Sequence, residues 1–169
     1  LEGIEPHQLI EAVGFMRVAH ALRPDNVYAL YNLGNILSAL CEDDESIAAF
    51  RAALARAPDL LAAQFNVTEV YRRQWMWDEL ADSARKVLAV DRGSVGHMAN
   101  CLAEAYDGLR DPDPWLRAAR EAAEIQPKNA NARNNYALHL SFRGKLKEAE
   151  AEFRTALELD PTNENALRN

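Results

Sequence analysis

Asparagine recurs along the chain at an almost constant spacing. Asn32, Asn66, Asn100, Asn135 and Asn169 follow one another at intervals of 34, 34, 35 and 34 in the numbering. Asparagine is a mediocre helix former, so helix propensity does not account for it. Its carboxamide carries one acceptor oxygen and two donor hydrogens, and can therefore pair with both the N–H and the C=O of an extended peptide. The chemistry that these residues offer is recognition of a peptide main chain.

Motifs for catalysis or metal binding are absent from the sequence. It contains no GxSxG, no glycine-rich phosphate loop and no HExxH. Cys41 and Cys101 form no CxxC pair and have no histidine at ligand spacing, and the histidines share no ligand spacing among themselves. The four histidines are His7, His20, His97 and His139. We therefore expect no enzyme, no catalytic residue, no cofactor and no metal.

One acidic run has a simpler explanation than a site. Residues 42–45 read Glu-Asp-Asp-Glu and fall where a helix is expected to start. Negative side chains are favourable at that end of a helix because of its dipole. We expect all four carboxylates to be solvated.

The elements that must position the asparagines belong to a sequence repeat. Pro24, Pro58, Pro127 and Pro161 each end an Ala/Leu-rich stretch, and they follow one another at intervals of 34, 69 and 34. The middle interval holds two periods, one of 34 and one of 35, and Asp91-Arg92-Gly93 stands where its internal proline is missing. Periods of this length are typical of stacked helical repeats.

Each period contains two helical patterns. In the copy from 130 to 163, two apolar stripes at helical spacing are formed by Tyr136, Ala137 and Leu140, and by Ala149, Phe153, Ala156 and Leu157. Gly144 separates them where a helix end needs a positive φ, and Pro161 stops the second helix. The repeat is therefore helix, turn, helix, turn.

The repeat resembles that of the tetratricopeptide repeat (TPR) family. Asn32-Leu33-Gly34, Leu37, Phe50, Ala53 and Pro58 match its signature in one copy, and Asn135-Tyr136-Ala137, Ala149, Phe153, Ala156 and Pro161 match it in another. The resemblance implies an all-α, right-handed α-solenoid. We expect a half repeat at 1–26, full repeats at 27–60, 61–94, 95–129 and 130–163, and the start of another repeat at 164–169.

The two middle repeats depart from the family pattern. Leu80 with Ala84, and Trp115 with Ala119, exchange the usual order of a small and then a large residue. The exchange keeps the volume of the core roughly constant, which cores tolerate. Leu102 falls where a small residue is usual, and we place the one inserted residue in the turn at 107–114.

The resemblance also implies where a ligand would bind. First helices of TPR repeats line a concave groove, and the recurring asparagine faces it, similar to the asparagine ladder of protein O-linked N-acetylglucosamine transferase. The residues expected to contact a peptide are Asn32, Asn66, Asn100, Asn135, Tyr28, Tyr31, Asn35, Phe65 and Arg72. The same positions include Asn131 and Asn134. In the alternative interpretation, the asparagines bond a neighbouring helix or water and Phe65 packs on the adjacent repeat.

Composition narrows the choice of partner. The 169 residues are 49% hydrophobic and 27% charged, with 19 Lys and Arg against 26 Asp and Glu, a net charge of -7. An acidic chain without a basic run is not expected to bind nucleic acid. No apolar stretch approaches the roughly 18 residues of a membrane span, so no membrane insertion is expected. The first residue is not Met, so we interpret the sequence as a piece of a longer chain, and we expect the cytoplasm as its location.

These observations predict a protein–protein interaction module that binds extended peptide or protein segments in its concave groove. Two alternatives remain open. The chain could be the substrate-recruiting arm of a larger enzyme, such as a glycosyltransferase or a sulfotransferase, or it could be a self-assembly scaffold. Independently of this choice, uncovered apolar faces at the two ends are expected to cause weak end-to-end self-association.

Overall fold

The computed structural model describes residues 6–168. The secondary structure of these residues consists of α-helices joined by turns. The half repeat at 1–26 and the fifth asparagine, Asn169, thus lie partly or wholly outside the described residues. The chain divides into two compact units, the first ending at Gln74 and the second beginning at Trp75. This division falls inside the repeat expected at 61–94.

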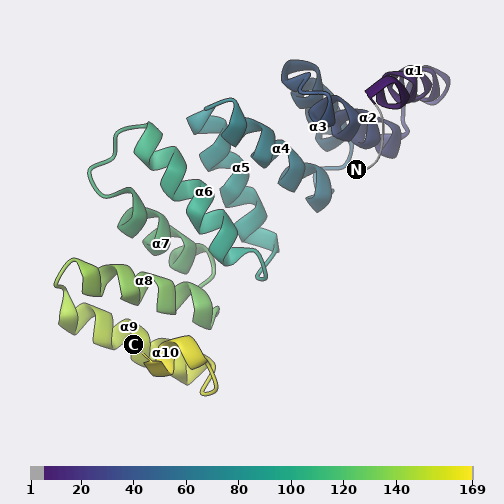
Figure 1. The fold of residues 1–169 in the computed structure, drawn as a ribbon. Coiled ribbons are helices and arrows are strands. Elements are labelled where there is room, and N and C mark those ends of the chain that lie inside the picture. The colour runs from purple at the N-terminus through teal and green to yellow at the C-terminus, as the bar shows by residue number, and fades with distance from the viewer. Residues whose placement is uncertain (1–5, 169) are drawn as a thin grey trace. The chain divides into compact units, whose positions relative to one another are not determined.

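The first unit holds four helices. They are α1 (Pro6–Leu22), α2 (Val27–Ala39), α3 (Asp43–Arg56) and α4 (Leu61–Arg73). Each packs on the helix before it in sequence, and α4 also reaches α2 (Figure 1). The packing is local, as expected for stacked helical hairpins.

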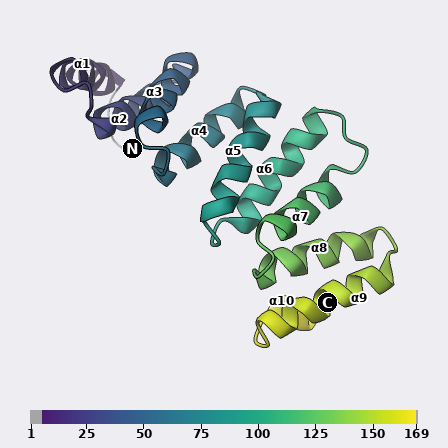
Figure 2. The same ribbon diagram turned by 180° about the vertical axis from the view of Figure 1, so that it is seen from behind.

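The second unit follows the same rule. Its helices are α5 (Trp77–Val90), α6 (Val95–Gly108), α7 (Pro114–Ile125), α8 (Ala130–Phe142), α9 (Leu146–Leu159) and α10 (Glu164–Arg168). From behind, α6 lies between α5 and α7, and α8 lies between α7 and α9 (Figure 2). Contacts also join α6 to α8 and α5 to α7. First helices and second helices therefore stack in separate layers within this unit.

Asparagine caps three of the helices that begin a repeat. The side chain of Asn26 accepts a hydrogen bond from the N–H of Ala29, and that of Asn129 accepts from the N–H groups of Asn131 and Ala132. Asn163 does the same at the start of α10. These caps satisfy backbone donors that the first turn leaves unpaired, so a second set of repeating asparagines stabilises the helix starts.

Each of the four turns inside the repeats contains one residue with a positive φ angle. Cys41, Trp75, Arg110 and Gly144 have φ angles of 61°, 57°, 62° and 71°. This conformation recurs once in each repeat period, so the same turn is built four times. Only Gly144 adopts the left-handed conformation without a steric cost. The other three copies keep the turn geometry without the residue that favours it.

The inserted residue lies in a helix and not in the turn where we expected it. α6 has 14 residues, whereas α2, α4 and α8 have 13 each. Counting back from the left-handed residue of each turn, Gly34, Thr68 and Ala137 align with Ala103 and not with Leu102. All four are buried, so the small position is occupied normally and the expectation for Leu102 was wrong. The turn before α7 is nevertheless long, because α7 begins late, at Pro114.

Close packing between paired helices depends on small residues. A Cβ atom added to Gly34 on α2 would lie 2.7 Å from the ring of Phe50 on α3, which is completely buried. The Ser46 hydroxyl donates a 2.8 Å hydrogen bond to the carbonyl oxygen of Gly34. Gly108 likewise leaves room for the indole of Trp77, which packs against it.

The exchange of large and small residues holds in only one of the two repeats. Leu80 and Ala84 are both fully buried. Ala119 is buried as well, but the side chain of Trp115 is 46% exposed and does not fill the core. The volume argument is therefore wrong for Trp115, which is left at the surface of α7.

Candidate functional site

A pocket in the first unit opens beside two of the predicted residues. It has a volume of about 410 Å³ and is lined by Asn35, Ser38, Phe50, Asn66 and Glu69. These side chains come from α2, α3 and α4. We call it the α2–α4 pocket.

Asn66 is tied to the neighbouring first helix in this pocket. Its Nδ2 donates a 2.6 Å hydrogen bond to Oδ1 of Asn35 and a 3.4 Å bond to the hydroxyl of Tyr31. This is the geometry of the alternative interpretation, in which the amide joins two helices. Both bonds use the NH2 group, so the carbonyl oxygen of Asn66 is the part of the amide that remains for a ligand.

The other predicted residues of the first unit differ in exposure. Asn32 and Tyr28 are exposed on α2. Tyr31 is half-buried with its ring 6.2 Å from that of Phe50, and Phe65 is half-buried too. Arg72 is exposed and forms a 2.9 Å ion pair with Glu69 one turn earlier on α4, so part of its charge is already balanced.

The second unit brings two predicted asparagines to one pocket. This pocket has a volume of about 210 Å³. Its lining consists of Gly96, Ala99, Asn100, Trp115, Ala119, Asn135 and His139. Asn100 comes from α6 and Asn135 from α8, the two adjacent first helices, and Trp115 comes from α7. We call it the α6–α8 pocket.

Aromatic side chains form one wall of the α6–α8 pocket. The rings of Trp115 and His139 stack at 6.3 Å with an interplanar angle of 20°, and Phe142 meets His139 edge-on at 6.0 Å. Burial lowers the pKa of the His139 imidazole, against a smaller opposing effect of Asp113. The imidazole is therefore neutral at neutral pH, and the pocket lining carries no charge. The sequence did not indicate that Trp115 belongs here.

Asn134 and Asn131, which we also expected to face the groove, are less available to a ligand than Asn135. Asn134 is buried, so its expected place on an open face was wrong. Asn131 is exposed, but its Oδ1 accepts a 2.9 Å hydrogen bond from Nδ2 of Asn163. Asn134 is adjacent to Asn135 in sequence, and helical rotation turns it to a different face of α8. Asn131 lies one turn before Asn135, and only Asn135 of the three lines the α6–α8 pocket.

The acidic run at 42–45 is not fully solvated, contrary to expectation. Asp43 is only 8% exposed and accepts hydrogen bonds from Arg73, through Nε at 2.9 Å and through Nη2, and from the Gln74 amide. The bond from Arg73 holds the pKa of the Asp43 carboxyl below its usual value. Glu45 pairs with Arg17 at the surface. Asp43 was missed because both of its partners belong to the next repeat and are distant in sequence.

One cysteine does have a histidine beside it. His97 and Cys101 lie one turn apart on α6, with 3.9 Å between the histidine Nε2 and the cysteine Sγ. The expectation that neither cysteine has a histidine at ligand spacing was therefore wrong, because i and i+4 on a helix face the same way. Cys101 is buried and Cys41 is exposed, and both are free thiols.

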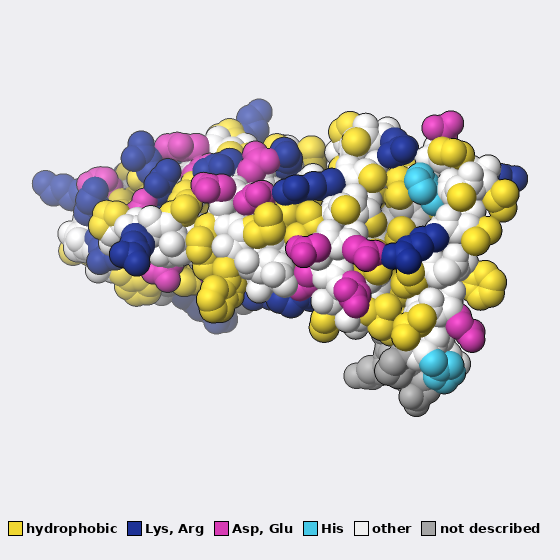
Figure 3. Space-filling model, turned by 90° about the horizontal axis from the view of Figure 1, so that it is seen from above, with side chains coloured by type: hydrophobic (Ala, Val, Ile, Leu, Met, Phe, Trp, Pro, Cys, Tyr) yellow, Lys and Arg dark blue, Asp and Glu magenta, His cyan; other side chains and the backbone are white. Residues whose placement is uncertain are grey.

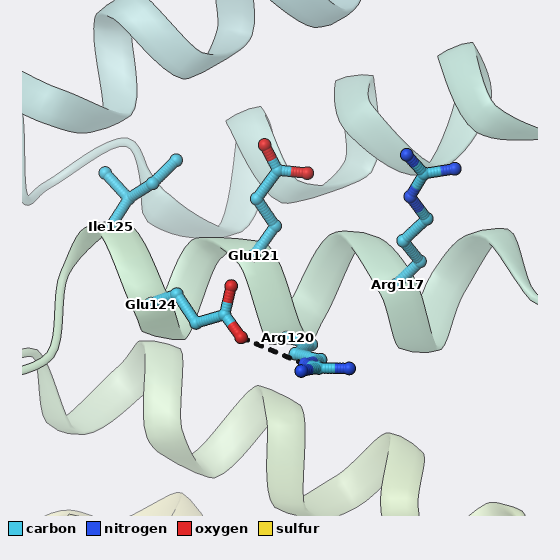
Figure 4. A pocket seen from close by; sticks show the side chains of 5 residues that line it. All are labelled: Arg117, Arg120, Glu121, Glu124 and Ile125. Atoms are coloured by element: carbon cyan, nitrogen blue, oxygen red, sulfur yellow. Dashed lines mark hydrogen bonds and ion pairs between the residues drawn. The ribbon is translucent and has the colours of Figure 1, made fainter.

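A larger pocket runs along α7. It has a volume of about 460 Å³, and all five lining residues belong to this helix (Figure 4). Its charged groups already have partners. Arg120 pairs with Glu124 at 2.9 Å, Arg117 with Asp111 at 2.6 Å, and Glu121 with Arg85 at 2.5 Å. This surface is a set of ion pairs, and nothing in it points to a ligand.

On the face shown in Figure 3, acidic and basic side chains are mixed with apolar ones. None of the described helices is long and apolar enough to cross a membrane.

Sequence-adjacent helical hairpins, stacked with first and second helices in separate layers, define the α-solenoid class. Within that class the repeat is specific: residues 27–60 and 130–163 each match a model of the tetratricopeptide repeat. These two segments are tetratricopeptide repeats. The full division into repeats remains a prediction.

Solved structures support the fold. A MamA double mutant (RS-1 ArsTM) is 18% identical, with a TM-score of 0.62 over 92% of this chain and 87% of that one. MamA from Desulfovibrio magneticus RS-1 is 17% identical, with a TM-score of 0.60 over 92% and 88%. YrrB, described as a TPR protein with an unusual peptide-binding site, is 24% identical, with a TM-score of 0.53 over 89% and 77%. No curated protein matches the sequence.

Tetratricopeptide repeat proteins bind peptides or proteins and are typically non-catalytic scaffolds. The chain is thus a protein-interaction module.

Proposed function

We propose that the chain binds an extended peptide segment along its first helices, with the asparagine amides holding the main chain of the ligand. The observation that supports this proposal most strongly is the α6–α8 pocket. Two asparagines from adjacent first helices, one repeat apart in sequence, line one pocket of about 210 Å³. A carboxamide at each side can accept from a peptide N–H and donate to a peptide C=O.

The α2–α4 pocket gives the proposal a second contact point in the first unit. There the NH2 group of Asn66 is held by Asn35 and Tyr31, which fixes the direction of its carbonyl oxygen. An amide fixed in this way loses little side-chain entropy when a ligand N–H bonds to that oxygen. Tyr28, which is exposed on α2, would add contact area.

The test starts from peptides selected on the full chain from a displayed library of random 12-residue sequences. The affinity of a selected peptide is then measured by fluorescence anisotropy for the double variant Asn100→Ala/Asn135→Ala. Each main-chain bond contributes about 0.5–1.5 kcal/mol, so we expect the double variant to bind about tenfold more weakly. Its melting temperature should hardly change, because polar substitutions at a helix surface have small effects on stability.

The matched control is Arg120→Ala/Glu124→Ala, which removes an ion pair of α7 that lines neither asparagine pocket and leaves the net charge unchanged. It should bind the peptide like the unmodified chain. Failure to select any peptide, or equal binding by the asparagine variant and the unmodified chain, contradicts the proposal.

A further inference from the structure

The α6–α8 pocket has features that the binding of a peptide main chain does not require. Asn100 and Asn135 could hold a main chain on a flat helical surface. Here they border a hollow, and the side chain of Trp115 on the second-helix layer stands in its wall. A hollow beside two main-chain anchors is where one side chain of an extended ligand would enter.

Three of the residues that line the pocket are small. Gly96 and Ala99 come from α6, and Ala119 comes from α7. Around Gly96 the space is open, because a Cβ atom built there would meet no atom within 4 Å. The volume of about 210 Å³ is large enough for a ring system and much larger than a methyl group needs.

The wall of the pocket favours a flat apolar group. The Trp115 side chain is 46% exposed although it is apolar, and it is stacked on His139, which limits its movement. A ring of the ligand can stack on the free part of this indole or meet it edge-on, which adds to the gain from burying apolar area.

The uncharged lining of the pocket disfavours charged side chains of a ligand. The lining contains no Asp, Glu, Lys or Arg, and burial keeps His139 neutral at neutral pH. Asp113 and Arg143 are the charged groups whose electrostatic effects reach His139, and they are bonded to each other at 2.7 Å. A charged side chain entering the pocket would lose water without gaining a counter-ion.

We propose that the α6–α8 pocket is a specificity pocket for one aromatic side chain of the bound peptide, flanked by main-chain contacts to Asn100 and Asn135. This inference rests on the proposed peptide-binding function and adds a preference to it. A ligand read only through its main chain would tolerate any sequence, whereas this pocket selects a Trp, Tyr or Phe at one position.

The pocket can be filled without disturbing the fold. Gly96 is exposed near the start of α6 with open space around it, and leucine is a better helix former than glycine. Gly96→Leu should therefore fold at least as well as the unmodified chain while occupying the hollow. Gly96→Ala is the matched control, since a methyl group leaves most of the volume free. Trp115→Ala is a second variant, which removes the indole that lines the pocket instead of filling the pocket.

The experiment uses the peptides selected from the 12-residue library, with affinities measured by fluorescence anisotropy. We expect the selected sequences to share an aromatic residue, and replacing it with alanine to weaken binding by about tenfold or more. Gly96→Leu and Trp115→Ala should each lower the affinity for the aromatic peptide to that for its alanine version. Neither variant should change the affinity for the alanine version. Gly96→Ala should bind both peptides like the unmodified chain.

The outcomes separate this inference from the function on which it rests. If Gly96→Leu binds the selected peptides normally while Asn100→Ala/Asn135→Ala does not, the specificity pocket is wrong and peptide binding by the asparagines stands. Selection of peptides with a common Lys, Arg, Asp or Glu in place of the aromatic residue also overturns the pocket assignment. If both Gly96→Leu and the asparagine variant bind normally, both proposals fail.

Discussion

Nη2 of Arg85 donates a 2.9 Å hydrogen bond to the hydroxyl of Tyr106, which joins α5 to the next first helix, α6. Arg51 and Tyr71 make the same connection between α3 and α4, at 2.8 Å. In the second unit Glu121 accepts hydrogen bonds from both Arg85 and Tyr106. The link between one repeat and the next is therefore partly polar, and it recurs at equivalent positions.

Removal of the hydroxyl tests this link. Tyr106→Phe keeps the ring, over which the guanidinium of Arg117 lies at 4.1 Å, but loses the bonds to Arg85 and Glu121. We expect the free energy of unfolding to fall by about 1–2 kcal/mol, since the hydroxyl bonds charged groups. Urea denaturation measures the change. A Tyr106→Phe chain as stable as the original would show that apolar packing alone joins α5 to α6.

The close contact between Gly34 and Phe50 makes a second prediction. Phe50→Ala should lower the stability by about 3–5 kcal/mol, because it leaves a cavity among fully buried atoms. Gly34→Ala should also destabilise, since its methyl group would lie 2.7 Å from the ring. In the double variant the new methyl group has room, so the two losses should not add. Strictly additive losses in urea denaturation would mean that the two residues do not share this space.

The left-handed residues of the turns offer a stabilising substitution. Arg110 has a φ of 62° and is exposed, so Arg110→Gly removes strain without removing packing. We expect a gain of about 1 kcal/mol, measured by thermal denaturation. Gly144→Ala, at the equivalent place in the last repeat, should lose a similar amount. A loss of stability in Arg110→Gly would contradict the geometry of this turn.

The buried carboxylate of Asp43 predicts a dependence on pH. Its pKa is lowered in the folded chain by the bond from Arg73, so it contributes stability at pH values above the unfolded pKa of about 3.9, and this contribution is lost as the pH falls through the folded pKa. Asp43→Asn should therefore be less stable than the original chain at pH 7, by roughly 1–3 kcal/mol, with the difference shrinking below about pH 4.

Asp44→Asn is the control for this experiment. Asp44 is exposed and neighbours Asp43 on α3, and its replacement by Asn changes the net charge by the same amount. It should have little effect at either pH, and an effect equal to that of Asp43→Asn would mean that net charge, and not the bond to Arg73, is responsible.

The helical secondary structure and the repeat length could be predicted from the sequence because they depend on local patterns. The proline spacing, the apolar stripes and Gly144 each act within a few residues of one another. The inserted residue was misplaced for the same reason: a helix that is one residue longer shows no local signal, and Leu102 and Ala103 are both acceptable core residues. Only the left-handed turn at Arg110, which no glycine marks, reveals the correct alignment.

The candidate site was predicted less completely, because its chemistry depends on which side chains meet in space. The sequence indicated Asn100 and Asn135 through their spacing, but not that the indole of Trp115 stays at the surface beside them. Asn66 has the same spacing and is nevertheless bonded to Asn35. Asn32, Asn66 and Asn135 each lie nine residues before the left-handed residue of their turn, whereas Asn100 lies ten before Arg110. Spacing along the chain therefore does not fix the face of the helix on which each asparagine lies, and its partners depend on the neighbouring helix.

The central claim is that asparagine amides of the first helices hold the main chain of a peptide. The most direct measurement is a titration of 15N-labelled protein with a selected 12-residue peptide, observing the side-chain NH2 signals, with those of Asn100 and Asn135 assigned from the single Asn→Ala variants. We predict that these two signals shift with the same dissociation constant as the anisotropy measurement, while that of Asn129, which caps α8, does not. If the peptide binds and the signals of Asn100 and Asn135 stay in place, the account is contradicted.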